Sequence, residues 1–108
     1  MDIRNFRKRM AISRLFAFDP GLEAYLFDSS NLRSRPEVLM DDAWELSVEQ
    51  RILLRAALDI WNGRGNVFLW ELLNQMNGER IACLIEAIRI YGVLHRSGEM
   101  TIHSEASR

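Results

Sequence analysis

The stretch SVEQRILLRAALDIWNG, residues 47–63, carries the strongest structural signal in the chain. Ser47 and Gln50 have the spacing of a capping box, in which each side chain accepts a hydrogen bond from the other residue's backbone. Asn62-Gly63 is a typical helix end. The pattern therefore predicts a helix from Ser47 to Trp61. At about 100° per residue, its apolar side should face the core and comprises Leu53, Leu54, Ala57, Ile60 and Trp61. The opposite side carries Arg51, Arg55 and Asp59, with an i,i+4 pairing.

Two further helices are predicted after this stretch. Asn66 is placed to cap a helix over residues 67–76, and Asn77-Gly78 separates it from a helix over residues 79–91 that ends at Gly92. Each has a broad apolar face that we expect to be buried. The first face comprises Phe68, Leu69, Leu72, Leu73 and Met76, and the second Ile81, Leu84, Ile85, Ile88 and Tyr91.

The C-terminal residues favour a small β-hairpin. Residues 93–96 and 99–103 flank Ser97-Gly98, a spacing that permits a two-residue turn. With this hairpin, the order of elements over residues 47–103 resembles a winged-helix domain. The resemblance implies that the helix over residues 79–91 is the recognition helix. Residues 104–108 are polar and are expected to form a frayed tail.

The N-terminal half contains shorter elements. Residues 3–18 are expected to form a basic helix with apolar residues on two sides, Ile3, Phe6 and Met10 on one and Ile12, Leu15 and Phe16 on the other. Such a helix is either clamped between two layers or packed loosely. Asp19-Pro20-Gly21 marks a turn, with Asp19 as a cap and Pro20 at the first position of a short helix over residues 22–27. Residues 28–31 indicate a loop, and residues 34–37 open a helix that extends toward Trp44.

Length and composition favour one all-α domain over residues 1–108, with five or so short helices around one core. A chain of 108 residues is of single-domain size, and a hydrophobic fraction of 48% is enough to build a core. The single cysteine, Cys83, excludes an internal disulfide. We expect a cytoplasmic protein without a membrane partner, because residues 1–14 lack a signal-peptide core and no apolar run reaches spanning length.

Signals for catalysis and metal binding are weak. His95 and His103 are the only histidines, and neither is near a pattern of nucleophile and base. Residues 60–71 have the length of an EF-hand loop, but Ile60 and Arg64 stand where calcium needs oxygen ligands. We therefore expect no enzyme activity, no cofactor and no metal.

Surplus apolar residues are the most informative feature for function. Val67 and Trp70 project away from the main face of one predicted helix, and Cys83 and Ile90 from the back of the next. The N-terminal segment could cover them. If it does not, an exposed tryptophan among aliphatic residues is typical of a protein-binding hot spot. The leading hypothesis is a non-enzymatic protein-interaction module that binds a protein partner or itself as a homodimer.

The alternative hypothesis is a DNA-binding regulator of winged-helix type. Its phosphate contacts would come from the basic cluster Arg4, Arg7, Lys8, Arg9 and Arg14, together with Arg80, Arg89 and Arg96. Nucleic acid is the less favoured partner, because the recognition helix would present Glu79 and Glu86 to phosphates and the net charge is −1.

Overall fold

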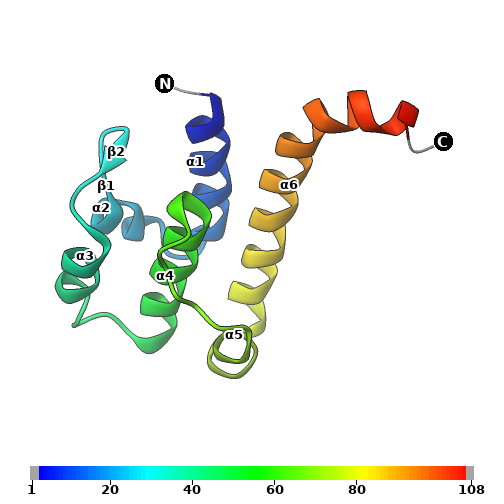
Figure 1. Ribbon diagram of the computed structural model, residues 1–108. Helices are drawn as coiled ribbons and strands as arrows, with labels where there is room; N and C mark the ends of the chain where they lie inside the picture. Colours follow the sequence, from blue (N-terminus) through cyan, green and yellow to red (C-terminus); the bar gives the residue numbers. More distant parts are fainter. Residues whose placement is uncertain (1–2, 107–108) are drawn as a thin grey trace.

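The computed structural model describes the backbone of residues 3–106 and the side chains of residues 3–92. Along this part of the chain, helices follow one another with one small hairpin between them (Figure 1). The mainly helical prediction is thus confirmed. In chain order the elements are α1 (Ile3–Leu15), the 3-10 turn η1 (Pro20–Leu22), α2 (Glu23–Leu26), β1 (Phe27–Asp28), β2 (Asn31–Leu32), α3 (Pro36–Asp42), α4 (Val48–Asn62), α5 (Leu69–Gln75) and α6 (Gly78–Ala106).

Helix α4 forms as its sequence predicts. The Ser47 and Gln50 side chains each accept a hydrogen bond from the other residue's backbone N–H, at 3.1 and 3.2 Å. At the other end, Gly63 adopts a φ of +75°, the left-handed conformation that ends many helices. The buried residues of α4 are Ile52, Leu53, Leu54, Ala56, Ala57 and Leu58, while Ile60 and Trp61 are half-buried.

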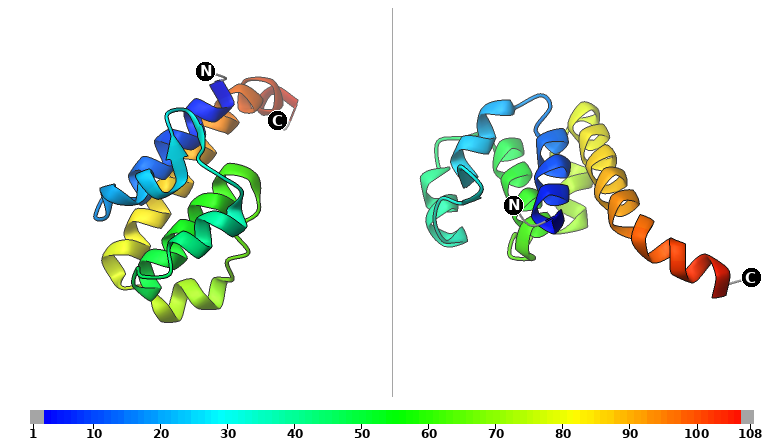
Figure 2. Two further views of the ribbon diagram at one scale, coloured as in Figure 1. Left: turned by 90° about the vertical axis from the view of Figure 1, so that its left-hand side faces the viewer. Right: turned by 90° about the horizontal axis from the view of Figure 1, so that it is seen from above.

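Helix α1 lies between α4 and α6, as Figure 2 shows from above. Its inner side is fully packed, and Ala11, Ile12, Leu15 and the following Phe16 are at most 1% exposed. Its other apolar side is not covered to the same degree, since Ile3, Phe6 and Met10 are 66%, 53% and 42% exposed. The predicted helix over residues 3–18 is therefore confirmed to Leu15, and only one of its apolar sides is clamped.

The hairpin lies where a loop was predicted. β1 and β2 pair antiparallel, with Phe27 opposite Leu32, and the turn between them places Ser29 at a φ of +64°. The Phe27 ring packs edge-on against Trp61 of α4, with centroids 4.9 Å apart. Together with α2 and α3, the hairpin forms the side of the molecule away from α6 (Figure 1).

Arg55 and Asp59 fix the connection between α4 and α5. The Asp59 carboxylate accepts hydrogen bonds from the backbone of Gly65 and Val67, and the Arg55 guanidinium donates to the Gly65 carbonyl and to both Glu71 carboxylate oxygens. The predicted i,i+4 pairing of Arg55 with Asp59 is therefore wrong, because both side chains are engaged with the loop.

The predicted Asn66 cap is also wrong. Asn66 lies in the loop at a φ of +52°, and α5 begins only at Leu69 with Phe68 at the cap position. The Glu71 carboxylate accepts from the Phe68 N–H at 3.0 Å. The loop residues Gly65, Asn66 and Val67, which Arg55 and Asp59 hold, thus delay the start of the helix.

An ionic cluster joins the start of α4 to the start of α6. Arg80 donates two hydrogen bonds of 2.8 Å to the Asp19 carboxylate, and Gln50 donates a third to it at 3.2 Å. Glu49 lies 3.3 Å from Arg80 and also accepts from the Asn77 backbone. Pro20 stands at the first helical position as predicted, but the Asp19 side chain makes no cap bond because it pairs with Arg80.

The predicted C-terminal hairpin is wrong. Helix α6 continues through Gly92 and Ser97-Gly98 to Ala106, so residues 93–103 are helical and the predicted wing is absent. Gly92 does not adopt a positive φ, so it does not end the helix as Gly63 does. Without this hairpin, residues 47–103 do not have the predicted winged-helix arrangement. Residues 104–106 belong to α6, residues 107–108 lie outside the described residues, and the frayed tail stays a prediction.

The buried face of α6 also differs from the prediction. Cys83 and Ala87, one turn apart, are 7% and 0% exposed, whereas Ile85 and Ile88, which were predicted to be core, are 53% and 58% exposed. Helix α6 packs mainly on α1. The small residues Cys83 and Ala87 thus lie on the covered side of α6 and Ile85 and Ile88 turn outward, while Ile81, Leu84 and Tyr91 are partly buried against the core.

Candidate functional site

The largest group of exposed apolar side chains lies on α5 and α6. Six of these residues are more than half exposed, and we call them the α5–α6 surface: Phe68, Leu69, Trp70, Leu73, Ile85 and Ile88. Four come from one helix and its cap residue, and two from the next helix. Several large apolar side chains exposed on two consecutive helices are typical of a protein-interaction site rather than of single, scattered surface residues.

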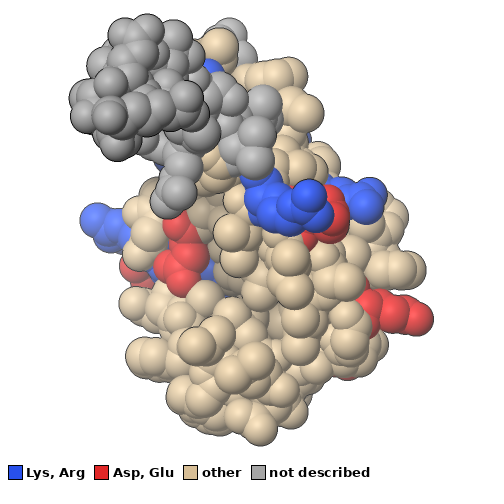
Figure 3. All heavy atoms as spheres, turned by 90° about the vertical axis from the view of Figure 1, so that its right-hand side faces the viewer, with Lys and Arg blue, Asp and Glu red and all other residues tan. Residues whose placement is uncertain are grey.

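Charge next to this surface lies in its α6 part, where Glu86 and Arg89 lie beside Ile85 and Ile88 and pair with each other at 3.2 Å. Figure 3 shows the molecule from the side of α6, and the lower part of the view, where α5 and the start of α6 lie, is nearly free of charged side chains. The low charge removes the desolvation cost that buried ions would impose on a partner. The face is therefore suited to close apolar contact.

Helix α5 is held in place from its start. The pair of Arg55 with both oxygens of Glu71 fixes the first turn, with distances of 2.7 and 2.9 Å. The hydrogen bonds from Arg55, followed by the one from the Phe68 backbone, hold the pKa of Glu71 below its usual range. At the other end, Met76 is buried. Trp70 and its neighbours are thus presented by an anchored helix.

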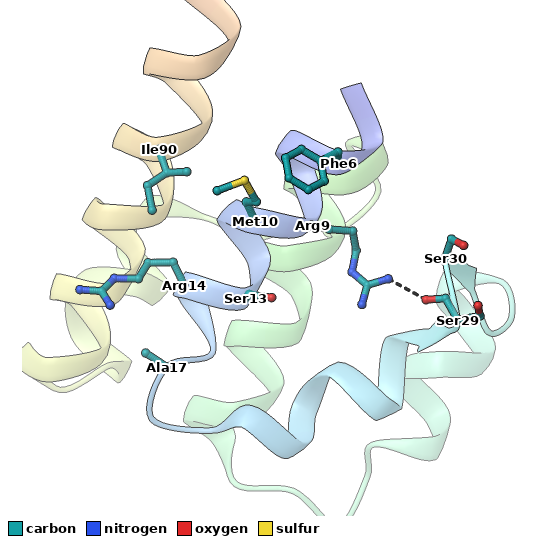
Figure 4. Close-up of a pocket in the computed structure, with 9 residues that line it drawn as sticks. All are labelled: Phe6, Arg9, Met10, Ser13, Arg14, Ala17, Ser29, Ser30 and Ile90. Carbon is teal, nitrogen blue, oxygen red and sulfur yellow. Dashed lines mark hydrogen bonds between the residues drawn. The ribbon is translucent and has the colours of Figure 1, made fainter. Parts of the chain in front are cut away.

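A second feature is a shallow, open groove of about 790 Å³ along α1, which we call the α1 groove (Figure 4). Phe6 and Met10 form its floor, Ile90 of α6 lies on one side, and Ser29 and Ser30 of the hairpin turn lie on the other. The groove therefore joins three elements that are distant in sequence.

Arg9 and Arg14 supply the charge of the groove. The Arg9 guanidinium lies 3.9 Å from the Phe27 ring centroid and donates to the Ser29 carbonyl at 2.8 Å, with Glu23 3.7 Å away. Arg14 is exposed, and no hydrogen bond or ion pair joins its guanidinium to another residue of the described part. Arg14 is thus the cation of the groove that is open to a ligand.

The four predicted partner-binding residues are distributed over different environments. Trp70 is 59% exposed and lies on the α5–α6 surface, whereas Ile90 is half-buried and lines the α1 groove. Val67 is partly buried against the core, and Cys83 is buried. Neither Val67 nor Cys83 is presented to a partner. The structure therefore does not bring the four residues together.

Sequence reasoning missed the other members of the α5–α6 surface because their helical spacing resembles that of core residues. Phe68, Leu69, Leu73, Ile85 and Ile88 were all predicted to face inward. One signal was present: helix α5 is only seven residues long and carries four large apolar side chains, Leu69, Trp70, Leu72 and Leu73. These apolar residues spread over a wider arc of the helix than Glu71, Asn74 and Gln75 do, which is more than one narrow core contact buries.

The predicted phosphate-binding residues are mostly engaged within the molecule. Lys8 donates to the Trp61 carbonyl at 2.6 Å, Arg80 pairs with Asp19, and Arg89 lies 3.2 Å from Glu86. Arg9 contacts Phe27, Ser29 and Glu23. Arg4 is exposed on α1, Arg7 is half-buried there, and the Arg96 side chain lies outside the described side chains. Lys8, Arg9, Arg80 and Arg89 are therefore committed to contacts within the chain.

Within the described residues, no group of three histidine, cysteine, aspartate or glutamate side chains is arranged to hold a metal ion. The side chains of His95 and His103 lie outside the described ones. No described helix is long and apolar enough to cross a membrane.

Comparison of the chain with protein-family models, with curated proteins and with solved structures finds no match. Its function therefore has to be argued from its own geometry.

Proposed function

We propose that the chain is a non-enzymatic protein-interaction module, and that the α5–α6 surface binds a second copy of the chain. The observation that carries this proposal is the exposure of six large apolar side chains on two consecutive helices, Trp70 among them. Burying such side chains against a partner is favourable at roughly 25 cal/mol per Å² of apolar area. Tryptophan is the residue type most enriched at the centre of binding interfaces.

A second copy is the partner that this surface suits best. In a twofold dimer the same patch faces itself, so a patch of one charge would meet like charge, whereas the six residues of this surface are all apolar and the neighbouring Glu86 and Arg89 are paired with each other. An acidic or basic partner would find few opposite charges there. The resulting contact depends on apolar burial and should therefore be insensitive to salt.

DNA binding is the less favoured function. The predicted wing is absent, and Lys8, Arg9, Arg80 and Arg89 already contact groups of the chain itself. A regulator that contacts several phosphates needs free cations along one face. DNA binding therefore serves as a competing outcome in the tests below.

The lone thiol supports a cytoplasmic location as part of this proposal. Cys83 is buried and unpaired, and the sequence offers no other cysteine. Proteins of oxidising compartments more often use paired cysteines.

The test compares two exposed tryptophans. Trp70 is 59% exposed on the α5–α6 surface, and Trp44, after α3, is 73% exposed elsewhere. In sedimentation equilibrium, Trp70→Ala should weaken self-association by about tenfold or more, which corresponds to a hot-spot loss of about 1.4 kcal/mol. Trp44→Ala should leave it unchanged.

A charged substitution is a second test of the α5–α6 surface. Ile88→Glu places a carboxylate at a position that is 58% exposed, so the monomer should fold with an unchanged circular dichroism spectrum. The dimer should be lost, since the carboxylate would be buried without a partner. Equal association of all three variants would refute the assignment of the surface.

A further inference from the structure

We propose that the α1 groove is a second binding site, and that it takes the apolar face of an acidic amphipathic helix from a protein partner. The groove and the α5–α6 surface have no residue in common. The inference therefore does not depend on the self-association proposed above. Three properties support it: the shape of the groove, its apolar lining and one unpaired cation.

The shape favours an elongated ligand. From Phe6 to Arg14 the floor follows α1 for about 12 Å, or a little over two helical turns. The groove is open along its length, whereas a small-molecule pocket encloses most of its ligand. A helix laid along α1 would cover the opening and contact both Ile90 and the hairpin turn.

The lining supplies anchor points for aliphatic side chains. Phe6 and Met10 are 53% and 42% exposed and lie one turn apart, with Ile90 across from them (Figure 4). Methionine adapts to ligand side chains of different shape, as it does in other helix-binding grooves. A partner helix with apolar residues at i, i+4 and i+7 would match this arrangement.

The charge of the groove selects an acidic partner. Both charged residues in its lining are cations, and its remaining polar residues are serines. Arg9 is already placed by Phe27, Ser29 and Glu23, so Arg14 is the residue that remains to pair with a carboxylate of the ligand. A flanking glutamate on the partner helix would meet it at the rim of the groove.

A nucleic acid fits the same groove less well. Its phosphates require several cations along a track, and Arg14 is the only groove cation without a partner in the described part of the chain. Its bases would leave Met10 and Ile90 without the aliphatic contacts that a leucine-bearing helix provides.

The experiment uses a labelled synthetic peptide of roughly 15 residues, long enough to form a helix, with leucines at i, i+4 and i+7 and flanking glutamates. Fluorescence anisotropy measures its binding to the full chain. Arg14→Glu should weaken binding by about tenfold, and Met10→Glu should weaken it at least as much. Arg64→Glu changes the net charge equally at an exposed loop position and should have no effect.

A charge swap makes the result specific. A peptide with lysines in place of its glutamates should bind Arg14→Glu better than it binds the natural chain. Thermal melting of each variant confirms that it is folded. Trp70→Ala should bind the acidic peptide normally, which separates this site from the dimer surface.

Three results would overturn the proposal. The first is equal binding of the acidic peptide by Arg14→Glu and Arg64→Glu, and the second is no binding by the natural chain. The third is duplex DNA binding that Arg14→Glu abolishes and that falls steeply with salt, which would make the groove a nucleic-acid site.

Discussion

Gly65 shows how one residue can decide the geometry of a connection. A Cβ atom at this position would lie 1.7 Å from the Arg55 carbonyl oxygen, and its backbone N–H and carbonyl are bonded to Asp59 and Arg55. The loop passes this close to α4 only because glycine has no side chain. The start of α5, and with it the presentation of Trp70, follows from this contact.

We expect Gly65→Ala to destabilise the fold by about 2 kcal/mol or more, because the clash is with backbone and forces the loop to move. The melting temperature should fall by roughly 10 °C. Gly21→Ala is the matched control, since nothing lies within 4 Å of its added Cβ. Equal melting of both variants would show that the loop does not approach α4 as described.

Asp19 makes stability depend on pH. The hydrogen bonds from Arg80 are the main cause that lowers the pKa of its carboxyl below the usual value. The folded chain therefore binds this proton less readily than the unfolded chain. The stabilisation is complete above the unfolded pKa of about 3.9 and is lost as the pH falls through the lower folded value.

Denaturant unfolding between pH 7 and pH 2 tests this dependence. Asp19→Asn should cost roughly 1–3 kcal/mol at neutral pH and should flatten the acid loss of stability. Asp41→Asn, at an exposed position, serves as the control. An acid profile of Asp19→Asn that matches that of the natural chain would contradict the role of the Asp19–Arg80 pair.

At the scale of elements, local signals predicted some helices well and others poorly. The Ser47–Gln50 capping box and Gly63 fix both ends of α4 through contacts within a few residues, so sequence alone could find them. The start of α5 depends on Arg55 and Asp59, which lie several residues away across the loop. No sequence pattern near Asn66 indicates that the start of α5 depends on these two residues.

Helix α6 is the element where glycine misled the prediction. Gly92 looked like a helix end, yet nothing lies within 4 Å of its added Cβ and its φ is not positive. Glycine within a helix is tolerated at a cost, and only a left-handed φ makes it a terminator.

Gly92→Ala should therefore stabilise the chain by about 0.5–1 kcal/mol, because alanine is the better helix former. Gly63→Ala should destabilise it by roughly 1 kcal/mol, since alanine disfavours the φ of +75° found there. Both changes can be measured by thermal unfolding. A loss of stability in Gly92→Ala would restore the predicted helix end at Gly92.

At the scale of the whole molecule, the sequence predicted that apolar helix faces build the core, but it did not predict which side of α6 faces that core. The sequence patterns correctly predicted a mainly helical fold, and Leu53, Leu54 and Ala57 are buried as expected. Helix α6 buries its Cys83 and Ala87 side, and it packs mainly on α1. That contact joins helices more than sixty residues apart in sequence, so periodicity within α6 could not reveal it.

The sequence predicted one residue of the α5–α6 surface, Trp70, and the structure adds the others. Trp70 was recognised as surplus to the core, and the structure adds Leu73 and Ile88, which a helical pattern assigns to the interior. Exposure depends on which neighbours are available to cover a helix. In this chain the Cys83 side of α6 is covered and Ile88 is left exposed.

The most direct test of the central claim is the solution mass of the natural chain, measured by light scattering over a range of concentrations at low and high salt. We predict that the mass rises from the 12.6 kDa of the monomer toward twice that value, and that salt does not reduce it. A mass of 12.6 kDa at every concentration, or a dimer that dissociates as salt is added, would contradict an apolar self-association surface on α5 and α6.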